Sequence, residues 1–261
     1  MSSARPSIAE LRAVCQPGSL LERRSGEHWA GRLYMRRLSL YVTRWLVGTR
    51  ATPNALTLLM IVVGLAAAVA VAVPGIVTAL AAVVLIQGYL LLDCVDGEVA
   101  RWKQVSSAAG VYLDRLGHHV VEAAVVVGLG VRAAGGPSTA PSWWVVLGAV
   151  AALLVVLGKL ETDLVTVARV GAGLPSGQGE EADHRSRVTS VRRLRRVFDL
   201  LPVHRVIGAI ELSLLVLAVA VVDAVLATVV GTQALLVVVA ATALLVAVGH
   251  PVTIVSSDRL R

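Results

Sequence analysis

Six long apolar stretches constrain this chain more than any other feature of its sequence. A helix that crosses a bilayer needs about 20 apolar residues. Stretches of about that length lie at 55–73, 76–98, 108–132, 142–166, 205–228 and 233–254. Charged residues make up only 16% of the 261-residue chain, against roughly 25% in soluble domains. We therefore expect an all-α integral membrane protein with six transmembrane helices, and we exclude a disordered chain and a water-soluble enzyme.

Polar segments flank and interrupt one membrane domain. The expected parts are an N-terminal segment at 1–54, the membrane domain at 55–255 with a basic loop at 167–204, and a tail at 256–261. The N-terminal segment lacks the short charged start and apolar core of a signal peptide, so we expect it to be retained. Cys15 and Cys94 form no CxxC pair, so we expect neither a disulfide framework nor a zinc site.

The basic residues predict the orientation of the chain. Of the 24 Lys and Arg residues, 21 fall in the N-terminal segment, the loops around 101–107 and 167–205, and the C-terminal tail. Arg132 alone falls on the opposite side. Because Lys and Arg stay on the cytoplasmic side of a membrane, we expect a cell-membrane protein with both termini in the cytoplasm and a site that faces it.

Two basic stretches are typical of helices that lie on a membrane surface. Residues 29–47 and 185–201 each interleave arginines with large apolar side chains at helical spacing. Each predicts an amphipathic helix on anionic lipids, and the first would precede the membrane domain. Simple anchoring and a grip on a phosphorylated substrate remain equal alternatives. With only 4% aromatic residues, the basic charge does not indicate a nucleic-acid partner.

Ionisable residues gather at the facing ends of the second and third spans. One helix face carries Asp93, Asp96, Gly97 and Ala100, and the next carries Gly110, Asp114 and His118. Six residues, 102–107, connect the two spans and predict antiparallel neighbours. Carboxylates that converge inside a membrane need a positive partner. Oxygen ligands favour Mg²⁺ or Mn²⁺, and two such ions could clamp a phosphoryl group.

The acidic pattern resembles the signature of the CDP-alcohol phosphatidyltransferases, D-x2-D-G-x2-A-R-x8-G-x3-D-x3-D. Seven of its eight fixed positions are present, namely Asp93, Asp96, Gly97, Ala100, Arg101, Gly110 and Asp114. Residues 52–57, TPNALT, resemble the T-P-N-x-L-T entry of the same family. The resemblance implies six spans, an amphipathic helix ahead of them and a homodimer.

The resemblance also implies a reaction and its residues. An alcohol acceptor would attack a CDP-alcohol and release CMP, with CDP-diacylglycerol as the expected donor and a polar CDP-alcohol, of the CDP-inositol or CDP-glycerol type, as the alternative. Two Mg²⁺ or Mn²⁺ ions would bind Asp93, Asp96 and Asp114. The residues implied to bind the CDP moiety are Asn54, Thr57, Asp93, Gly97, Ala100, Arg101 and Gly110. A guanidinium such as that of Arg101 suits a diphosphate.

His118 replaces the fourth aspartate of the pattern. A neutral imidazole can accept a proton and can ligate a metal, so His118 is a candidate general base and a candidate ligand beside Asp114. Glu122, one turn further on, is a weaker candidate to orient the ring or to bind metal. Loss of activity is the alternative, which three costly carboxylates disfavour.

Arg115 and Lys159 are weaker candidate site residues, and a second class of membrane protein is an alternative to an enzyme. Arg115 could reach an acceptor pocket or extend to lipid headgroups. Lys159 could bind an acceptor phosphate, pair with a carboxylate of the motif or form an ion pair between helices. A transporter or a non-catalytic scaffold is the rival, but a transporter would show broken helices near the midplane and a repeated half. The sequence shows neither.

Overall fold

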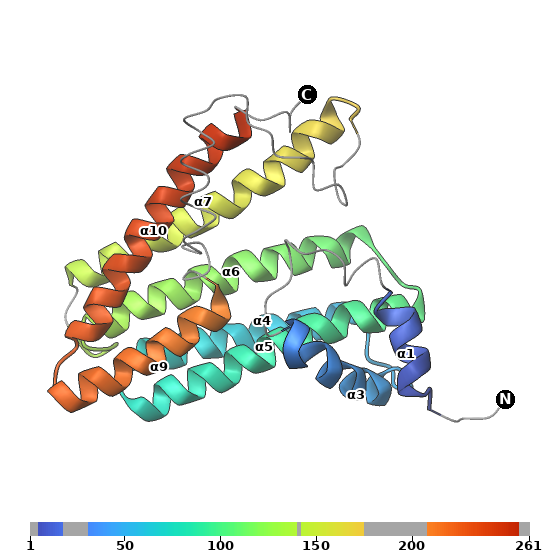
Figure 1. Ribbon diagram of the computed structural model, residues 1–261, viewed down its shortest axis with the longest axis horizontal. Helices are drawn as coiled ribbons and strands as arrows, with labels where there is room; N and C mark the ends of the chain where they lie inside the picture. The colour runs from blue at the N-terminus through green and yellow to red at the C-terminus, as the bar shows by residue number, and fades with distance from the viewer. Residues whose placement is uncertain (1–4, 18–30, 140–141, 175–207, 256–261) are drawn as a thin grey trace. The chain divides into compact units, whose positions relative to one another are not determined.

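The computed structural model describes residues 5–17, 31–139, 142–174 and 208–255, which form helices joined by short connections (Figure 1). The helices are α1 (Ile8–Cys15), the π-helical turn η1 (Gly31–Met35), α3 (Arg36–Leu46), α4 (Pro53–Ala72), α5 (Ile76–Lys103), α6 (Ala108–Ala133), α7 (Trp143–Gly171), α9 (Ala209–Leu226) and α10 (Val230–Val255). Among these described residues, six helices are long and apolar enough to cross a membrane. The expected all-α fold with six spanning helices is confirmed.

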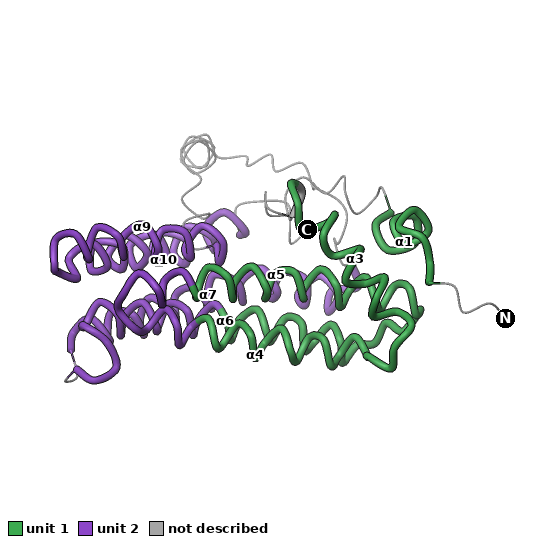
Figure 2. The backbone as a smooth tube through the Cα atoms, turned by 90° about the horizontal axis from the view of Figure 1, so that it is seen from below, with its two compact units in different colours: residues 1–67, 81–121 green, residues 68–80, 122–261 purple. Residues whose placement is uncertain are grey.

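The chain forms two compact units, which Figure 2 distinguishes by colour. Unit 1 comprises residues 1–67 and 81–121, and unit 2 comprises 68–80 and 122–261. Unit 1 therefore contains α1, η1 and α3 together with most of α4 and α5 and the first half of α6. Every residue of the family pattern described above lies in unit 1.

The second span is longer than its apolar stretch. Helix α5 continues through the acidic motif and ends at Lys103, instead of residue 98. The ammonium group of Lys103 donates hydrogen bonds to the carbonyl oxygens of Thr49 and Ala51 at 2.9 and 2.7 Å. Residues 104–107 therefore connect α5 to α6, where the sequence predicted a connection of six residues.

The boundary between the last two spans depends on Asp223. Its carboxyl group accepts hydrogen bonds from the backbone N–H groups of Gly231 and Thr232 at 2.7 and 3.1 Å, and from the Thr232 hydroxyl at 2.6 Å. A carboxyl group satisfies the unpaired N–H groups at a helix start in this way. Helix α10 therefore starts at Val230, three residues before the predicted boundary at 233.

Arg132, the basic residue expected on the far side of the membrane, is buried in unit 2. Its guanidinium donates to the carbonyl oxygens of Val73 and Gly75 at 2.7 and 3.0 Å. These carbonyl groups belong to the turn between the end of α4 and the start of α5. Arg132 thus stabilises the turn between α4 and α5.

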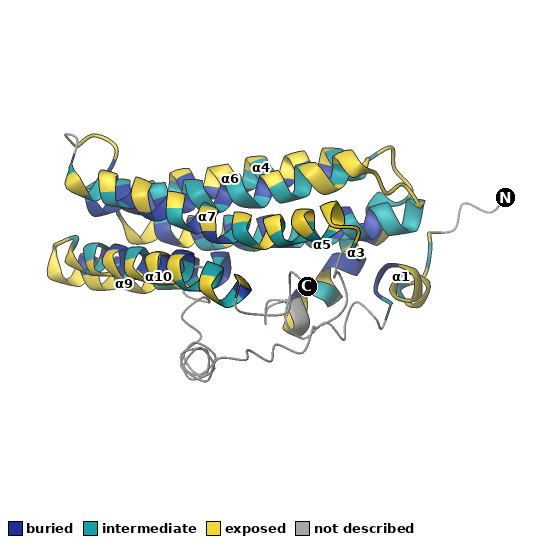
Figure 3. Ribbon diagram, turned by 90° about the horizontal axis from the view of Figure 1, so that it is seen from above, coloured by how far each residue is buried: buried dark blue, intermediate teal, exposed yellow. Residues whose placement is uncertain are grey.

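Close contact between helices in unit 2 depends on glycine. An ideal Cβ atom on Gly148 of α7 would lie 2.7 Å from the Cα atom of Gly130 in α6, so the two backbones touch and exclude any side chain. Small residues allow such approach in membrane helices. Large apolar side chains on α7 and α10, such as Leu153 and Val248, are exposed, and Figure 3 shows exposed residues along these helices. Such a surface suits lipid.

The predicted amphipathic helix at 29–47 corresponds to η1 and α3. Ser39, Leu40 and Thr43 are buried, whereas Tyr41 and Trp45 are exposed. Exposed aromatic residues on a basic helix are typical of a membrane interface, so the expected role remains a prediction with structural support. The second predicted amphipathic helix, at 185–201, lies outside the described residues.

Glu98 connects three helices of unit 1. Its side chain is fully buried, and its carboxyl group accepts hydrogen bonds from the Gln16 amide at 2.7 Å and from the hydroxyl groups of Ser39 and Thr43 at 2.6 Å each. Gln16 follows α1, and the two hydroxyl residues belong to α3. Because a buried polar group needs hydrogen bonds, Glu98 holds α1 and α3 against α5.

We expect Glu98→Ala to release α1. Three buried donors would lose their acceptor, which should lower the free energy of unfolding in detergent by about 3 kcal/mol and speed hydrogen exchange at residues 8–15. Glu98→Gln is the matched control, because its amide oxygen still accepts and its NH₂ group can donate to a hydroxyl. Equal exchange in the wild-type protein and Glu98→Ala would contradict this role.

Candidate functional site

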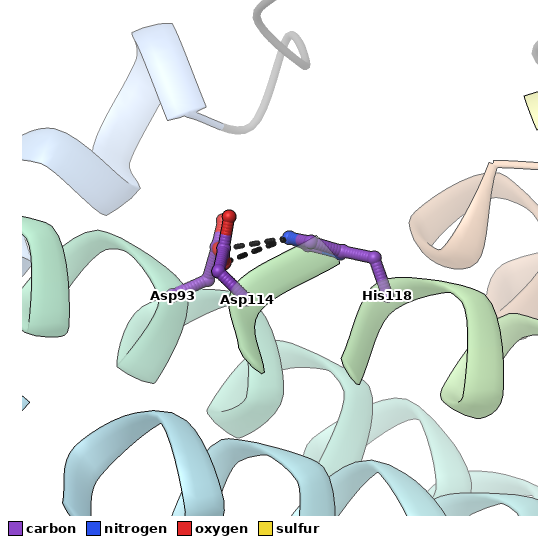
Figure 4. Close-up of side chains that lie close together, drawn as sticks. All are labelled: Asp93, Asp114 and His118. Atoms are coloured by element: carbon purple, nitrogen blue, oxygen red, sulfur yellow. Dashed lines mark hydrogen bonds and ion pairs between the residues drawn. The ribbon is translucent and has the colours of Figure 1, made fainter. Parts of the chain in front are cut away.

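Asp93, Asp114 and His118 come together in unit 1 (Figure 4). Nε2 of His118 lies 3.0 Å from Oδ1 of Asp93 and 3.5 Å from Oδ1 of Asp114. Each of the three residues offers one potential ligand atom, and these atoms lie within 4.8 Å of one another. The two helices therefore turn the predicted acidic faces toward each other, as their spacing indicated.

Helix α4 packs closely against the helices that carry these side chains. An ideal Cβ atom on Gly117 of α6 would lie 2.7 Å from the Ile61 side chain, and one on Gly64 of α4 would lie 2.5 Å from Val121. Because these glycines have no side chain, α4 and α6 lie closer together than larger residues would allow. The close packing limits how far His118, the neighbour of Gly117, can move.

The arrangement fits a divalent cation. Two carboxyl groups and an imidazole supply oxygen and nitrogen ligands, and carboxyl oxygens are the donors that suit Mg²⁺ and Mn²⁺. The side chains are 31%, 41% and 28% exposed for Asp93, Asp114 and His118. A cation, its water ligands and a phosphate can therefore reach them.

Asp96 has a different partner in the structure. It is buried, and its Oδ2 atom accepts a hydrogen bond of 2.5 Å from the Thr57 hydroxyl. Among the described residues, Asp96 lies outside the three-residue group, although the sequence assigned it to the same metal site. The hydrogen bond joins two predicted site residues, Thr57 of α4 and Asp96 of α5. The role of Asp96 as a metal ligand stays a prediction.

Two further contacts join residues that were implied to bind the CDP moiety. An ideal Cβ atom on Gly97 would lie 3.2 Å from Nη1 of Arg101, and one on Gly110 would lie 3.1 Å from Oδ1 of Asn54. A side chain at either glycine would displace its neighbour. The glycines thus leave room for the guanidinium and the amide, and nucleotide binding at these positions stays a prediction. Ala100, which lies between Gly97 and Arg101 on α5, is half-buried.

Helix α1 fixes the direction of Arg101. Nε of Arg101 donates a hydrogen bond of 2.7 Å to the carbonyl oxygen of Cys15, the last residue of α1. The Cys15 thiol in turn donates to the Glu98 carbonyl oxygen at 3.4 Å. Burial raises the pKa of this thiol to about 11, so it stays protonated at neutral pH. The bond from Nε leaves the terminal nitrogens of Arg101 above Gly97.

The remaining candidates have mixed outcomes. Lys159 donates a hydrogen bond to Oε1 of Glu122 within unit 2, so the ion pair between helices is the alternative that the structure shows for Lys159. Nδ1 of His119 donates to the carbonyl oxygen of Arg115 at 2.6 Å. The acceptor-pocket role of Arg115 stays a prediction.

Tyr89 is a site residue that the sequence reasoning missed. Its hydroxyl oxygen lies 2.5 Å from Nδ1 of His118, and its ring is buried. A signal was present, because Tyr89 precedes Asp93 by four residues and therefore shares its helix face. The family pattern starts only at Asp93 and does not include Tyr89. Glu98 was missed because no pattern marked it.

Comparison with known proteins agrees with the acidic motif. The family model described as CDP-alcohol phosphatidyltransferase matches residues 50–257, which covers most of the chain and all six spanning helices. No curated protein matches the chain in a sequence search.

We expect detergent-purified protein to bind Mn²⁺ through this group. Asp93→Asn and Asp114→Asn should each weaken Mn²⁺ affinity by about tenfold or more, because each removes a charged ligand. Titration followed by electron paramagnetic resonance measures the free ion. Asp163→Asn, an acid of α7 in unit 2, is the matched control and should leave the affinity unchanged. Equal binding by all variants would contradict the assignment.

Proposed function

The chain belongs to the CDP-alcohol phosphatidyltransferase family, and on this premise we propose that it is a metal-dependent transferase that uses CDP-diacylglycerol and releases CMP. Transfer of a phosphatidyl group from a CDP-alcohol to an alcohol is the reaction that the family implies. The observation that carries the finer proposal is the meeting of Asp93, Asp114 and His118, with their ligand atoms within 4.8 Å of one another.

The proposed reaction breaks the phosphoanhydride bond of the CDP-alcohol and forms a phosphate ester bond. The oxygen of the acceptor hydroxyl forms a bond to the phosphorus that carries the diacylglycerol, and the bond from that phosphorus to CMP breaks. CMP takes the electron pair of the broken bond, and the hydroxyl proton is released. A bound Mg²⁺ or Mn²⁺ ion would polarise the phosphoryl oxygens and stabilise the charge on the leaving group.

The chain's own residues would hold the donor from two sides. We propose that Asp93, Asp114 and His118 hold the cation. Arg101 would bind the diphosphate, since a guanidinium pairs with phosphate oxygens through several N–H groups. The hydrogen bond from its Nε to the Cys15 carbonyl supports this role, because it orients the terminal nitrogens in advance. Asn54, beside Gly110, would contact the nucleotide.

Nε2 of His118 could have either of two roles. This nitrogen can ligate a cation or can take the proton of the acceptor hydroxyl. Its distances of 3.0 and 3.5 Å to two carboxyl oxygens favour the ligand role, which we adopt. His118→Asp, which restores the family pattern, should then keep turnover, whereas His118→Ala should lower Mn²⁺ affinity and turnover together. Loss of turnover alone would assign His118 to the proton.

We also propose that the site faces the cytoplasm. The basic residues of the segments next to Asp93 and Asp114, and of the N-terminal segment, support this orientation through the positive-inside rule. The soluble nucleotide CMP would then leave into the compartment where cytidine nucleotides are made. Exposed basic and aromatic residues of α3 would contact the anionic lipids of the same leaflet.

The test is CMP release by purified protein in detergent with Mg²⁺ or Mn²⁺. We expect release from CDP-diacylglycerol with one member of a panel of alcohol acceptors, and loss of that release on chelation of the metal. Asp93→Asn should lower turnover by a factor of about 100 or more, whereas Asp163→Asn should not. CDP-inositol and CDP-glycerol belong to the donor panel, since activity with these alone would replace the donor assignment.

Absence of CMP release from every donor and acceptor pair, in both the wild-type protein and His118→Asp, would contradict the proposed function. Turnover that survives Asp93→Asn would leave the function standing and overturn the metal assignment.

A further inference from the structure

Both ring nitrogens of His118 have a partner, and the two nitrogens face different kinds of group. Nε2 faces the carboxyl groups of Asp93 and Asp114, whereas Nδ1 lies 2.5 Å from the Tyr89 hydroxyl. The two rings meet edge to face, with an interplanar angle of 85°. Tyr89 thus holds the imidazole from the side away from the proposed cation.

Tyr89 is itself held in place. It is 1% exposed, and an ideal Cβ atom on Gly64 of α4 would lie 3.0 Å from its ring. A buried aromatic ring packed this closely against a helix backbone has little freedom to move. The position of its hydroxyl is therefore fixed, and a hydrogen bond to this hydroxyl can determine the orientation of the His118 ring.

The hydroxyl can serve both states of the histidine ring. Without a cation, Nε2–H can donate to Oδ1 of Asp93 at 3.0 Å, and the tyrosine O–H then donates to Nδ1. A cation at Nε2 needs the lone pair of that nitrogen, so the proton must lie on Nδ1. A tyrosine hydroxyl can donate or accept, and it would then accept from Nδ1–H.

We propose that Tyr89 is the positioning residue of His118: its hydroxyl fixes the ring and accepts the Nδ1 proton, so that the lone pair of Nε2 is directed at the cation beside Asp93 and Asp114. The inference rests on the proposed function, because it needs His118 as a ligand. It also explains the departure from the family pattern, since a histidine in place of the fourth aspartate needs a partner that an aspartate does not.

The test compares Tyr89→Phe in two backgrounds. Phenylalanine keeps the buried ring and removes only the hydroxyl, so we expect the variant to fold. With His118 present, it should weaken Mn²⁺ affinity by about tenfold, the usual effect of removing the partner of a ligating histidine. In the His118→Asp background, where no imidazole needs the hydroxyl, the same substitution should change the affinity by less than about twofold.

Controls separate positioning from packing. Tyr41→Phe removes the hydroxyl of an exposed tyrosine on α3 and should leave the affinity unchanged. Unchanged Mn²⁺ affinity in Tyr89→Phe, or an equal loss in both backgrounds, would overturn the proposal, because the second result would indicate a general structural effect.

The Mn²⁺ measurement also separates this inference from the proposed function. Background-dependent loss of Mn²⁺ affinity without CMP release in any assay would support Tyr89 as the positioning residue and reject the transferase assignment. CMP release together with an unchanged Mn²⁺ affinity in Tyr89→Phe would do the reverse.

Discussion

A carboxyl group inside a membrane-spanning helix needs a partner, and this requirement organises the structure around α5 and α6. These two helices carry five acids: Asp93, Asp96, Glu98, Asp114 and Glu122. Each acid meets a hydrogen-bond donor, a histidine or a lysine. The partner comes from another part of the chain in every case but Asp114, whose partner His118 lies one turn further along α6. Burial of an acid without such a partner costs several kcal/mol, so the contacts fix how the neighbouring helices pack.

These acids have two kinds of role, which differ in the partners that the acids bind. Glu98 and Asp96 are buried and bind neutral donors from α3 and α4, such as the hydroxyl groups of Thr43 and Thr57. Asp93 and Asp114 are partly exposed and share His118, which leaves carboxyl oxygens accessible to a ligand. Acids that hold helices together are thus next to acids that remain open for chemistry, since Asp96 follows Asp93 by only three residues on α5.

Sequence patterns predicted the spans and the pairing of the acidic faces, because membrane helices must be long and apolar and because helical spacing places i and i+4 together. Partners from distant parts of the chain were not predictable. Gln16 and Cys15 bond to Glu98 and Arg101 of α5, more than 80 residues away, and no local periodicity in the sequence indicates contacts at such a separation.

We propose that Asp93, Asp114 and His118 form a cation site for a CDP-alcohol. A crystal structure of the protein with Mn²⁺ and CMP, with anomalous scattering recorded at the manganese edge, tests it most directly. We expect an anomalous peak within ligand distance of both carboxyl groups and of Nε2, with Nδ1 of His118 still bonded to Tyr89. A peak elsewhere, with Nε2 still bonded to Asp93, would contradict it.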